Sequence, residues 1–192
     1  MKKNIRILSI CGSLRANSSN NSIVKAIAAL VPENMDFIIY RGLADLPPFN
    51  DSHDEPLPVM DLRKQLNESD AVFICTPEYA FGVPGVLKNL LDWTVGTGEF
   101  VGKPVAVVTA ATGGEHAHAS ILLTLKALSA KIAEEGTAII SHVRSKLDEK
   151  GNVKDSQTIE TLKSVLHKLV NNSHEIRNEK LEIKNEELEN SK

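Results

Sequence analysis

A turn rich in hydrogen-bond donors follows the first apolar run of the sequence. Residues 5–11 read as a buried strand, and residues 12–20 are GSLRANSSN. Serine hydroxyls, an arginine side chain and the free N–H groups at the start of a helix together are suited to bind a phosphate. Serine and asparagine are also common in helix caps and turns, which explains about half of the pattern. Capping does not explain Arg15, so we predict an anion site that includes Ser13, Arg15 and Ser18.

Other phosphate-binding loops do not fit this turn. A P-loop needs a lysine and a serine or threonine directly after its last glycine, and a dinucleotide turn needs three spaced glycines, whereas Gly12 stands alone. A low-molecular-weight phosphatase would place an arginine at a fixed distance after its cysteine nucleophile, and from Cys11 that position is Asn17. Cys11 is therefore interpreted as a strand residue and not as a nucleophile.

Polar segments also follow two later strands of the predicted sheet, at residues 77–82 and 111–118. Because ligands of open α/β sheets bind at the carboxyl ends of the strands, we expect these segments to converge with the first turn on one site. His116 and His118 have no cysteine or second pair of ligands nearby in the sequence. We therefore predict no metal site, and we expect both histidines to frame the substrate pocket.

Short apolar runs alternate along the chain with amphipathic segments of helical length. Each run is nearly continuous in apolar residues, as in strands that helices cover on both faces. The expected strands are residues 5–11, 36–40, 71–76, 105–110 and 137–143, and the expected helices are residues 21–30, 59–67, 84–95, 119–134 and 155–170. This alternation predicts an α/β fold, a doubly wound five-stranded parallel sheet with helices on both faces.

The length of 192 residues is that of one domain with one core. Residues 42–58 contain several prolines and are expected to form an ordered surface loop. Residues 173–192 carry few large apolar side chains among many charges, so they are a frayed helical extension or a disordered tail, with an oligomer contact as the less favoured alternative. We therefore divide the chain into a domain at residues 1–172 and a charged tail at residues 173–192.

The composition limits the partners and the compartment. The formal net charge of −3 is mild, whereas nucleic-acid binding favours a basic chain and electron transfer between proteins favours an acidic one. No apolar run is long enough to cross a membrane, and none is of the signal-peptide type. The two cysteines, Cys11 and Cys75, read as small buried hydrophobes. We expect a cytoplasmic protein that acts on a small molecule.

Two motifs resemble those of the NADPH-dependent FMN reductase family. GSLRANSSN at residues 12–20 resembles the family's GSLRxxSxN loop, and PEYAFGVPGVLKNLLDW at residues 77–93 is similar to its PEYxxxxPGxLKNxxDW segment. The resemblance covers about residues 5–143 and implies a flavodoxin-like fold, noncovalent FMN, and reduction of quinones, azo dyes, free flavin or chromate by NADPH or NADH. Carried over position by position, it implies an FMN phosphate held by Ser13, Arg15, Ser18 and Asn20, and an isoalloxazine edge lined by Pro77, Glu78 and Tyr79.

The chemistry of the second segment agrees with this role. Glu78 and Tyr79 follow a strand end, so their backbone N–H groups can meet the pyrimidine oxygens of the flavin, and the ring of Tyr79 can flank it. Hydride transfer to a flavin needs no acid or base from the protein, so the sequence leaves the catalytic residues unknown and we name none.

The third segment departs from the family. Thr112, Gly113 and Gly114 allow a close approach to the flavin because glycine has no side chain. Where the family often has an arginine or glutamine, this sequence has Glu115 and His116. We expect these two residues to frame the acceptor pocket, and the alternative, given equal weight, is that both point to solvent on a mobile loop.

Two other functions and the oligomeric state are left open by the sequence. A flavodoxin-type electron carrier and a non-redox scaffold would keep the same fold, although the mild charge disfavours the first and the retention of Arg15 the second. The helix at residues 84–95, with Leu87, Leu91 and Trp93, offers an apolar face that could close the site from a neighbouring subunit. We therefore expect a homodimer or homotetramer.

Overall fold

The computed structural model describes residues 4–51 and 55–190. Residues 52–54 of the proline-rich segment and residues 191–192 of the tail lie outside the described residues. In chain order the elements are β1 (Ile5–Cys11), α1 (Ser19–Leu30), β2 (Met35–Ile39), a 3-10 turn (Gly42–Ala44), α2 (Leu57–Glu68), β3 (Ala71–Thr76), α3 (Gly85–Asp92), β4 (Pro104–Ala110), α4 (Glu115–Ala127), β5 (Lys131–Ile140), a second 3-10 turn (Val143–Lys146) and α5 (Ser156–Asn190).

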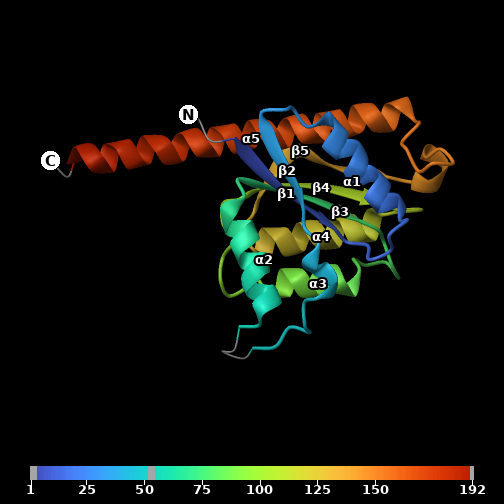
Figure 1. Cartoon of the computed structure of the whole chain (residues 1–192), viewed down its shortest axis with the longest axis horizontal. Helices are drawn as coiled ribbons and strands as arrows, with labels where there is room; N and C mark the ends of the chain where they lie inside the picture. The colour runs from blue at the N-terminus through green and yellow to red at the C-terminus, as the bar shows by residue number, and fades with distance from the viewer. Residues whose placement is uncertain (1–3, 52–54, 191–192) are drawn as a thin grey trace.

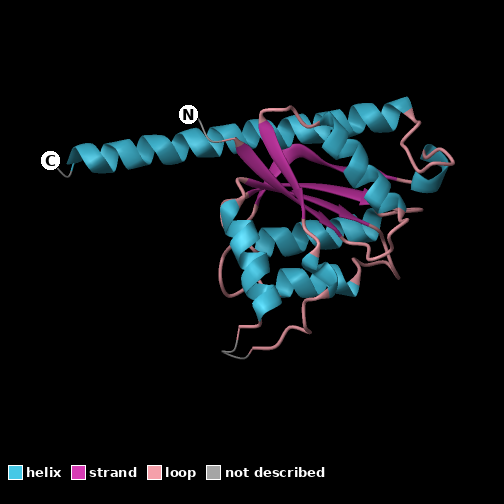
Figure 2. Cartoon of the chain, viewed as in Figure 1, coloured by secondary structure: helices cyan, strands magenta, loops and turns pink. Residues whose placement is uncertain are grey.

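The strands form one parallel five-stranded sheet in the order β2-β1-β3-β4-β5. Helices α1 and α5 cover one face, and α2, α3 and α4 cover the other (Figures 1 and 2). All residues of β3 and β4 are buried, because helices lie on both sides of these central strands. The predicted fold class, a doubly wound parallel sheet with helices on both faces, is confirmed.

The core consists of two clusters, one on each face of the sheet. Alternate residues of β3 show this division, since Val72 and Ile74 pack on the side of α2, α3 and α4, and Phe73 and Cys75 on the side of α1 and α5. Burial of each large apolar side chain contributes roughly 1.5–3 kcal/mol. Both clusters therefore fix the sheet whose carboxyl edge carries the polar segments.

Helix α3 does not present the apolar face that the sequence predicted for a neighbouring subunit. Leu87, Leu91 and Trp93 are buried in the core of their own chain. Trp93 also donates its Nε1–H to Pro47 O at 2.8 Å, which anchors the proline-rich segment on α3. The expectation that this face closes the site of another subunit is wrong, because these apolar side chains pack in the core of their own chain.

The boundaries of α4 and β5 differ from the predicted helix at residues 119–134 and strand at residues 137–143. Helix α4 begins at Glu115 and ends at Ala127, and β5 already begins at Lys131. Ser129 takes a left-handed conformation (φ 58°), and Ala130 N donates to Leu125 O at 3.0 Å, which ends the helix. The charged residues in the first half of β5 favoured a helix in the sequence analysis. An edge strand such as β5 tolerates charged residues, because it is not covered on all sides.

The last helix continues from the domain into the charged tail. Helix α5 is continuous to Asn190, and its C-terminal part extends beyond the sheet (Figure 1). Its first half packs on β4, β5 and α1. Of the two forms expected for the tail, the structure has the helical extension over the residues it describes. Within those residues, no helix combines the length and apolar character needed to cross a membrane.

Candidate functional site

Three polar segments that are far apart in the sequence line one cavity at the carboxyl ends of β1, β3 and β4. This cavity, called the site cavity below, has a volume of about 320 Å³. The predicted residues that line it are Ser13, Arg15, Ser18, Asn20, Pro77, Glu78, Tyr79 and Thr112. Gly113, Gly114, Glu115 and His116 do not line it, although Gly113 and Gly114 directly follow Thr112.

The first turn supplies donors to the cavity. Ser18 is the N-cap of α1, and its Oγ accepts a hydrogen bond from Asn21 N at 3.1 Å, so its own hydroxyl proton remains to be donated. The Oγ of Ser13 is buried and, among the described residues, has no hydrogen-bond partner. Arg15 is exposed at the rim. A buried hydroxyl without a partner is costly unless a ligand satisfies it, and these neighbours suit an anion.

Gly12 allows the turn to lie against the neighbouring strand. A Cβ at this position would lie 3.0 Å from Thr76 Oγ1 and 3.1 Å from Leu87 Cδ2. Gly12 N also donates to Cys75 O at 2.8 Å, which continues the pairing of β1 with β3. The lone glycine of the motif therefore serves close packing of the turn.

Asn20 lines the site cavity and also ties α1 to the sheet. Its Nδ2 donates to Ala110 O at 3.0 Å, and its Oδ1 accepts from Cys75 Sγ at 3.2 Å. The side-chain amide is thus engaged with the ends of β3 and β4, and one of its two N–H groups is left for a ligand. Asn20 therefore positions α1 against the sheet, and its contact with a phosphate stays a prediction.

The two cysteines are structural. Cys11 and Cys75 are free, buried and paired in register on β1 and β3. Burial raises the pKa of the Cys11 thiol, and it raises the pKa of Cys75 well above its ordinary value. A protonated buried thiol is a poor nucleophile, which agrees with the assignment of Cys11 as a strand residue.

Glu78 links the second segment to the helix after the third. Its Oε2 accepts a hydrogen bond from Ala117 N at 2.9 Å, in the first turn of α4. A carboxylate is favourable there because the N–H groups of the first turn have no partner within the helix. The side chain of Glu78 therefore fixes the distance between two segments that border the site cavity.

We expect Glu78→Ala to lower the free energy of unfolding by about 1–2 kcal/mol, because it removes a hydrogen bond between a charged group and a helix N-terminus. Glu78→Gln keeps an acceptor oxygen and should lose less. Urea unfolding measures both. Glu68→Ala is the matched control, since Glu68 only forms an exposed pair with Arg6, and such pairs contribute about 0–1 kcal/mol. Equal losses in Glu78→Ala and Glu68→Ala would contradict the proposed role of Glu78.

Tyr79 is part of a tight turn, and this corrects one expectation. Tyr79 N donates to Gly82 O at 2.9 Å, and Gly82 N donates to Tyr79 O at 3.0 Å. The backbone N–H of Tyr79 is therefore not available to a flavin oxygen. Its side chain still lines the site cavity and is exposed.

The two central residues of this turn have unusual backbone conformations. Ala80 and Phe81 have φ values of 48° and 60°, the pattern of a type I′ turn. Such turns favour asparagine, aspartate and glycine, because a side chain in the left-handed region costs roughly 1–2 kcal/mol. Neither Ala80 nor Phe81 is of a type that relieves this strain.

The glycines of the third segment are needed for packing. Gly114 has φ 130°, and a Cβ there would lie 3.1 Å from both Ile139 Cγ2 and Thr109 Cγ2. At Gly113 the nearest atom would be Glu115 Oε2, at 2.9 Å. The close contact that requires Gly114 is therefore with β4 and β5, and the sequence could not distinguish it from a contact with a ligand.

Glu115, His116 and His118 lie in the first turn of α4, not on a mobile loop. Glu115 and His116 are exposed. His118 is partly buried, with its Nδ1 2.9 Å from Thr109 Oγ1, and burial lowers the pKa of this imidazole. The expectation that His118 frames a substrate pocket is therefore wrong, because it packs against β4.

A fourth segment borders the site cavity and was missed in the sequence. Residues 142–145, after β5, line it, and His142 and Val143 donate backbone hydrogen bonds of 3.1 Å to Thr112 O and Ala111 O. The sequence assignment continued the last strand to Val143 and so counted the first two of these residues as strand. The left-handed conformation of His142 (φ 53°) turns the chain and brings Arg144 to the cavity.

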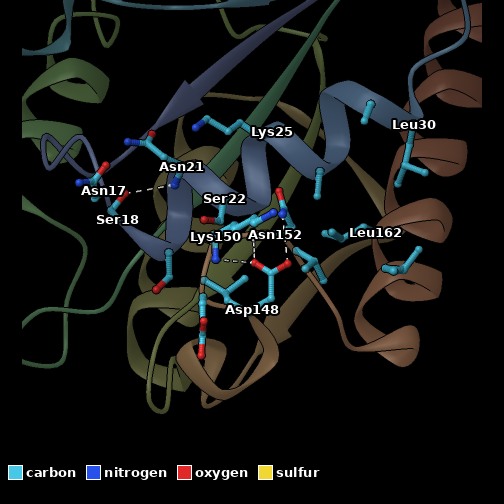
Figure 3. Close-up of a pocket in the computed structure, with 18 of the residues that line it drawn as sticks. Asn17, Ser18, Asn21, Ser22, Lys25, Leu30, Asp148, Lys150, Asn152 and Leu162 are labelled. Carbon is cyan, nitrogen blue, oxygen red and sulfur yellow. Dashed lines mark hydrogen bonds between the residues drawn. The ribbon is translucent and has the colours of Figure 1, made fainter.

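A larger cavity of about 700 Å³ lies on the outer side of α1. Asn17, Asn21 and Lys25 border it from the first turn and α1, and Lys150 and Asn152 from the loop before α5 (Figure 3). Neither the second nor the third polar segment reaches it. We assign the ligand to the smaller site cavity, because only there do the strand ends meet a buried hydroxyl without a partner.

The strand order defines a flavodoxin-like fold, and the donor-rich turn after β1 lies where the order of the strands reverses between β1 and β3, which is the place where such folds bind ligands. The model of one protein family, NADPH-dependent FMN reductase, matches residues 5–145, and the chain belongs to this family. It is an NAD(P)H-dependent oxidoreductase that uses FMN.

Known relatives agree with this assignment. A 2-hydroxy-1,4-benzoquinone reductase from a Burkholderia species is 29% identical over 172 residues, which cover 85% of this chain and 93% of the relative. An NAD(P)H-dependent FMN reductase from Pseudomonas aeruginosa is 30% identical over 177 residues, covering 88% and 95%. Among solved structures, the flavoenzyme NAD(P)H:(acceptor) oxidoreductase FerB from Paracoccus denitrificans has a TM-score of 0.79 at 28% identity, covering 89% of this chain and 98% of that one.

Proposed function

We propose that this protein reduces quinones with NADPH or NADH through FMN bound at the site cavity, and that azo compounds, free flavin and chromate are further acceptors. The observation that carries the site is the buried, unpartnered Oγ of Ser13 next to the N-terminus of α1 and to Arg15. When bound, FMN takes a hydride from the nicotinamide and passes two electrons to the acceptor. The balanced reaction converts NAD(P)H, a proton and a quinone to NAD(P)⁺ and a hydroquinone.

The residues of the cavity divide into two groups. Ser13, Arg15 and Ser18 hold the phosphate, because they combine hydroxyl donors and a guanidinium with the helix N-terminus. Pro77, Glu78, Tyr79 and Thr112 border the ring system, with Glu78 fixing their relative position through α4. All of these residues bind or position, and none is assigned a proton transfer.

The acceptor class is supported by the names of two relatives, the benzoquinone reductase of Burkholderia and a quinone reductase of Escherichia coli, which is 29% identical over 172 residues. A flavodoxin-type electron carrier is the alternative. It is not favoured, because the relatives have enzyme names and the net charge of −3 is mild, whereas electron transfer between proteins favours a strongly acidic chain.

The experiment is a comparison of cofactor binding and turnover. Purified protein loaded with FMN should be yellow, and it should oxidise NADPH or NADH only when a quinone is added, with one hydroquinone formed per nicotinamide. Steady-state rates with both nucleotides then rank the donors. Bound FMN without quinone-dependent oxidation of either nucleotide would leave the electron carrier as the better assignment.

We propose that the protein is a homodimer or homotetramer and that it is located in the cytoplasm. The buried face of α3 no longer supports it. Support comes from an apolar surface beside α4 and the edge strand β5, where Leu122, Leu123 and Ile132 border a groove and Leu123 is exposed. The free, buried thiols suit a reducing compartment. Light scattering that gave the monomer mass of 21.0 kDa would contradict the oligomer.

Glu115 is expected to influence the choice between charged and neutral acceptors. It is exposed and lies close to Gly113, next to the cavity residue Thr112. Glu115→Gln should raise kcat/KM for a sulfonated azo dye relative to a neutral quinone by up to about fivefold, because an exposed charge is worth at most ~1 kcal/mol.

The control for this prediction is Glu33→Gln, which removes an equal charge just before β2, at the opposite edge of the sheet. This control should not change the ratio of the two acceptors. Equal effects of Glu115→Gln on charged and neutral acceptors would leave Glu115 without a part in acceptor choice.

A further inference from the structure

Two aromatic side chains of the second segment are unusually exposed. The exposed fraction is 52% for Tyr79 and 75% for Phe81. Phe81 is not isolated, since its ring lies edge-on to that of His116, with the centroids 4.8 Å apart at an interplanar angle of 71°. The pair therefore joins the turn after β3 to the first turn of α4 and leaves most of the Phe81 ring open to solvent.

The backbone displays Phe81 at a conformational cost. Both central residues of the Tyr79–Gly82 turn are left-handed, at φ 48° and 60°, and the two hydrogen bonds between Tyr79 and Gly82 hold them there. A glycine or asparagine at position 81 would suit this backbone better than phenylalanine. Strained residues persist mainly at functional sites. The strain at Phe81 therefore indicates that its side chain has a function other than stabilising the fold.

The position of the pair relative to the site cavity is fixed by two independent contacts. Tyr79 lines the cavity and begins the strained turn. The hydrogen bond from Ala117 N to Glu78 Oε2 holds the same segment against α4, directly after His116. Phe81, in the hydrogen-bonded turn, and His116, in the first turn of α4, therefore both lie beside the cavity.

On the basis of the proposed function, we propose that Phe81 and His116 form an aromatic surface beside the site cavity on which the planar ring of an uncharged acceptor stacks. An aromatic acceptor needs a flat partner of its own size, and offset or edge-on aromatic contacts supply attraction beyond simple burial. The neighbouring carboxylate of Glu115 disfavours anionic rings at the same place. Phe81 and His116 are therefore residues that determine acceptor specificity, and they do not take part in the chemical step.

The decisive variant is Phe81→Gly, because it removes the ring and relieves the turn at the same time. Its Tm should be no lower than that of the wild type, while the ratio of kcat/KM for 1,4-naphthoquinone to kcat/KM for ferricyanide should fall about three- to tenfold. Phe81→Tyr keeps a ring and should keep the ratio. Leu57→Ala, which removes an exposed apolar side chain at the start of α2, outside the site cavity and the groove beside α4, is the matched control.

A binding measurement without turnover separates this proposal from the proposed function. Equilibrium dialysis of 1,4-naphthoquinone against the oxidised, FMN-loaded protein, with no nicotinamide present, should show a three- to tenfold weaker affinity in Phe81→Gly than in Leu57→Ala. If wild-type protein reduces the quinone but Phe81→Gly binds it as tightly, the aromatic surface is wrong and the proposed function stands. A wild type that binds FMN and never reduces a quinone overturns both.

An interface between two copies of the chain would be the other use of an exposed Phe81. Light scattering of Phe81→Gly at the concentration of the assays tests it. A mass equal to that of the wild type, together with the loss of naphthoquinone selectivity, supports the acceptor surface. A lower mass in Phe81→Gly overturns it in favour of a contact between subunits.

Discussion

Arg15→Ala is expected to weaken FMN binding by about 1.5–3 kcal/mol, roughly 10- to 150-fold, which is the usual worth of a hydrogen bond to a charged group. Arg15 is the only cation of the GSLRANSSN turn, and it lines the site cavity beside the N-cap of α1. Its guanidinium can bind two phosphate oxygens at once, which neither serine hydroxyl can do. Titration of the protein with FMN, followed by flavin fluorescence, measures the change.

Two further variants show whether the effect of Arg15 is local. Ser13→Ala should cost less than Arg15→Ala, because it removes one neutral hydroxyl that has no other partner among the described residues. Lys25→Ala removes the same charge from α1, where Lys25 borders the larger cavity and does not line the site cavity. FMN affinity should stay within twofold in Lys25→Ala. If Arg15→Ala and Lys25→Ala weakened FMN equally, the general charge of the region and not a phosphate contact would explain the result.

The sheet could be predicted from the sequence because its strands are covered on both faces. The runs that became β1, β3 and β4 are almost entirely apolar, so their number, type and parallel direction followed from the alternation with helices. The edge strand β5 was different. Its first half is polar enough to fit a helix, and a turn of three residues, 128–130, with Ser129 in the left-handed conformation, separates α4 from it.

The candidate site was predicted to the extent that its residues follow strand ends. Polar side chains after β1, β3 and β4 converge because parallel strands end at the same edge. The partners of individual atoms could not be predicted. The sequence does not show that Asn20 is engaged with Ala110 and Cys75, or that Glu78 binds the N-terminus of α4, because each contact joins residues from separate elements.

The two glycines of the third segment also differ in contacts that the sequence does not show. In sequence Gly113 and Gly114 are equivalent, and both read as space for a flavin ring. In the structure Gly114 has φ 130° and no room for a Cβ between Ile139 and Thr109, whereas Gly113 has no such conformation and faces the flexible carboxylate of Glu115.

Gly114→Ala should therefore lower the free energy of unfolding by about 2–5 kcal/mol, the sum of backbone strain and overpacking, and lower Tm by roughly 5–15 °C. Gly113→Ala is the matched control and should cost less than about 1 kcal/mol, because the carboxylate of Glu115 can move away. Urea unfolding of the FMN-free protein measures both without any contribution from the cofactor. If Gly114→Ala were as stable as the wild type without FMN and differed only in FMN affinity, Gly114 would be required by the ligand, as its place in the motif first suggested. A large loss in the FMN-free protein means that Gly114 is required by the packing of α4 against β4 and β5.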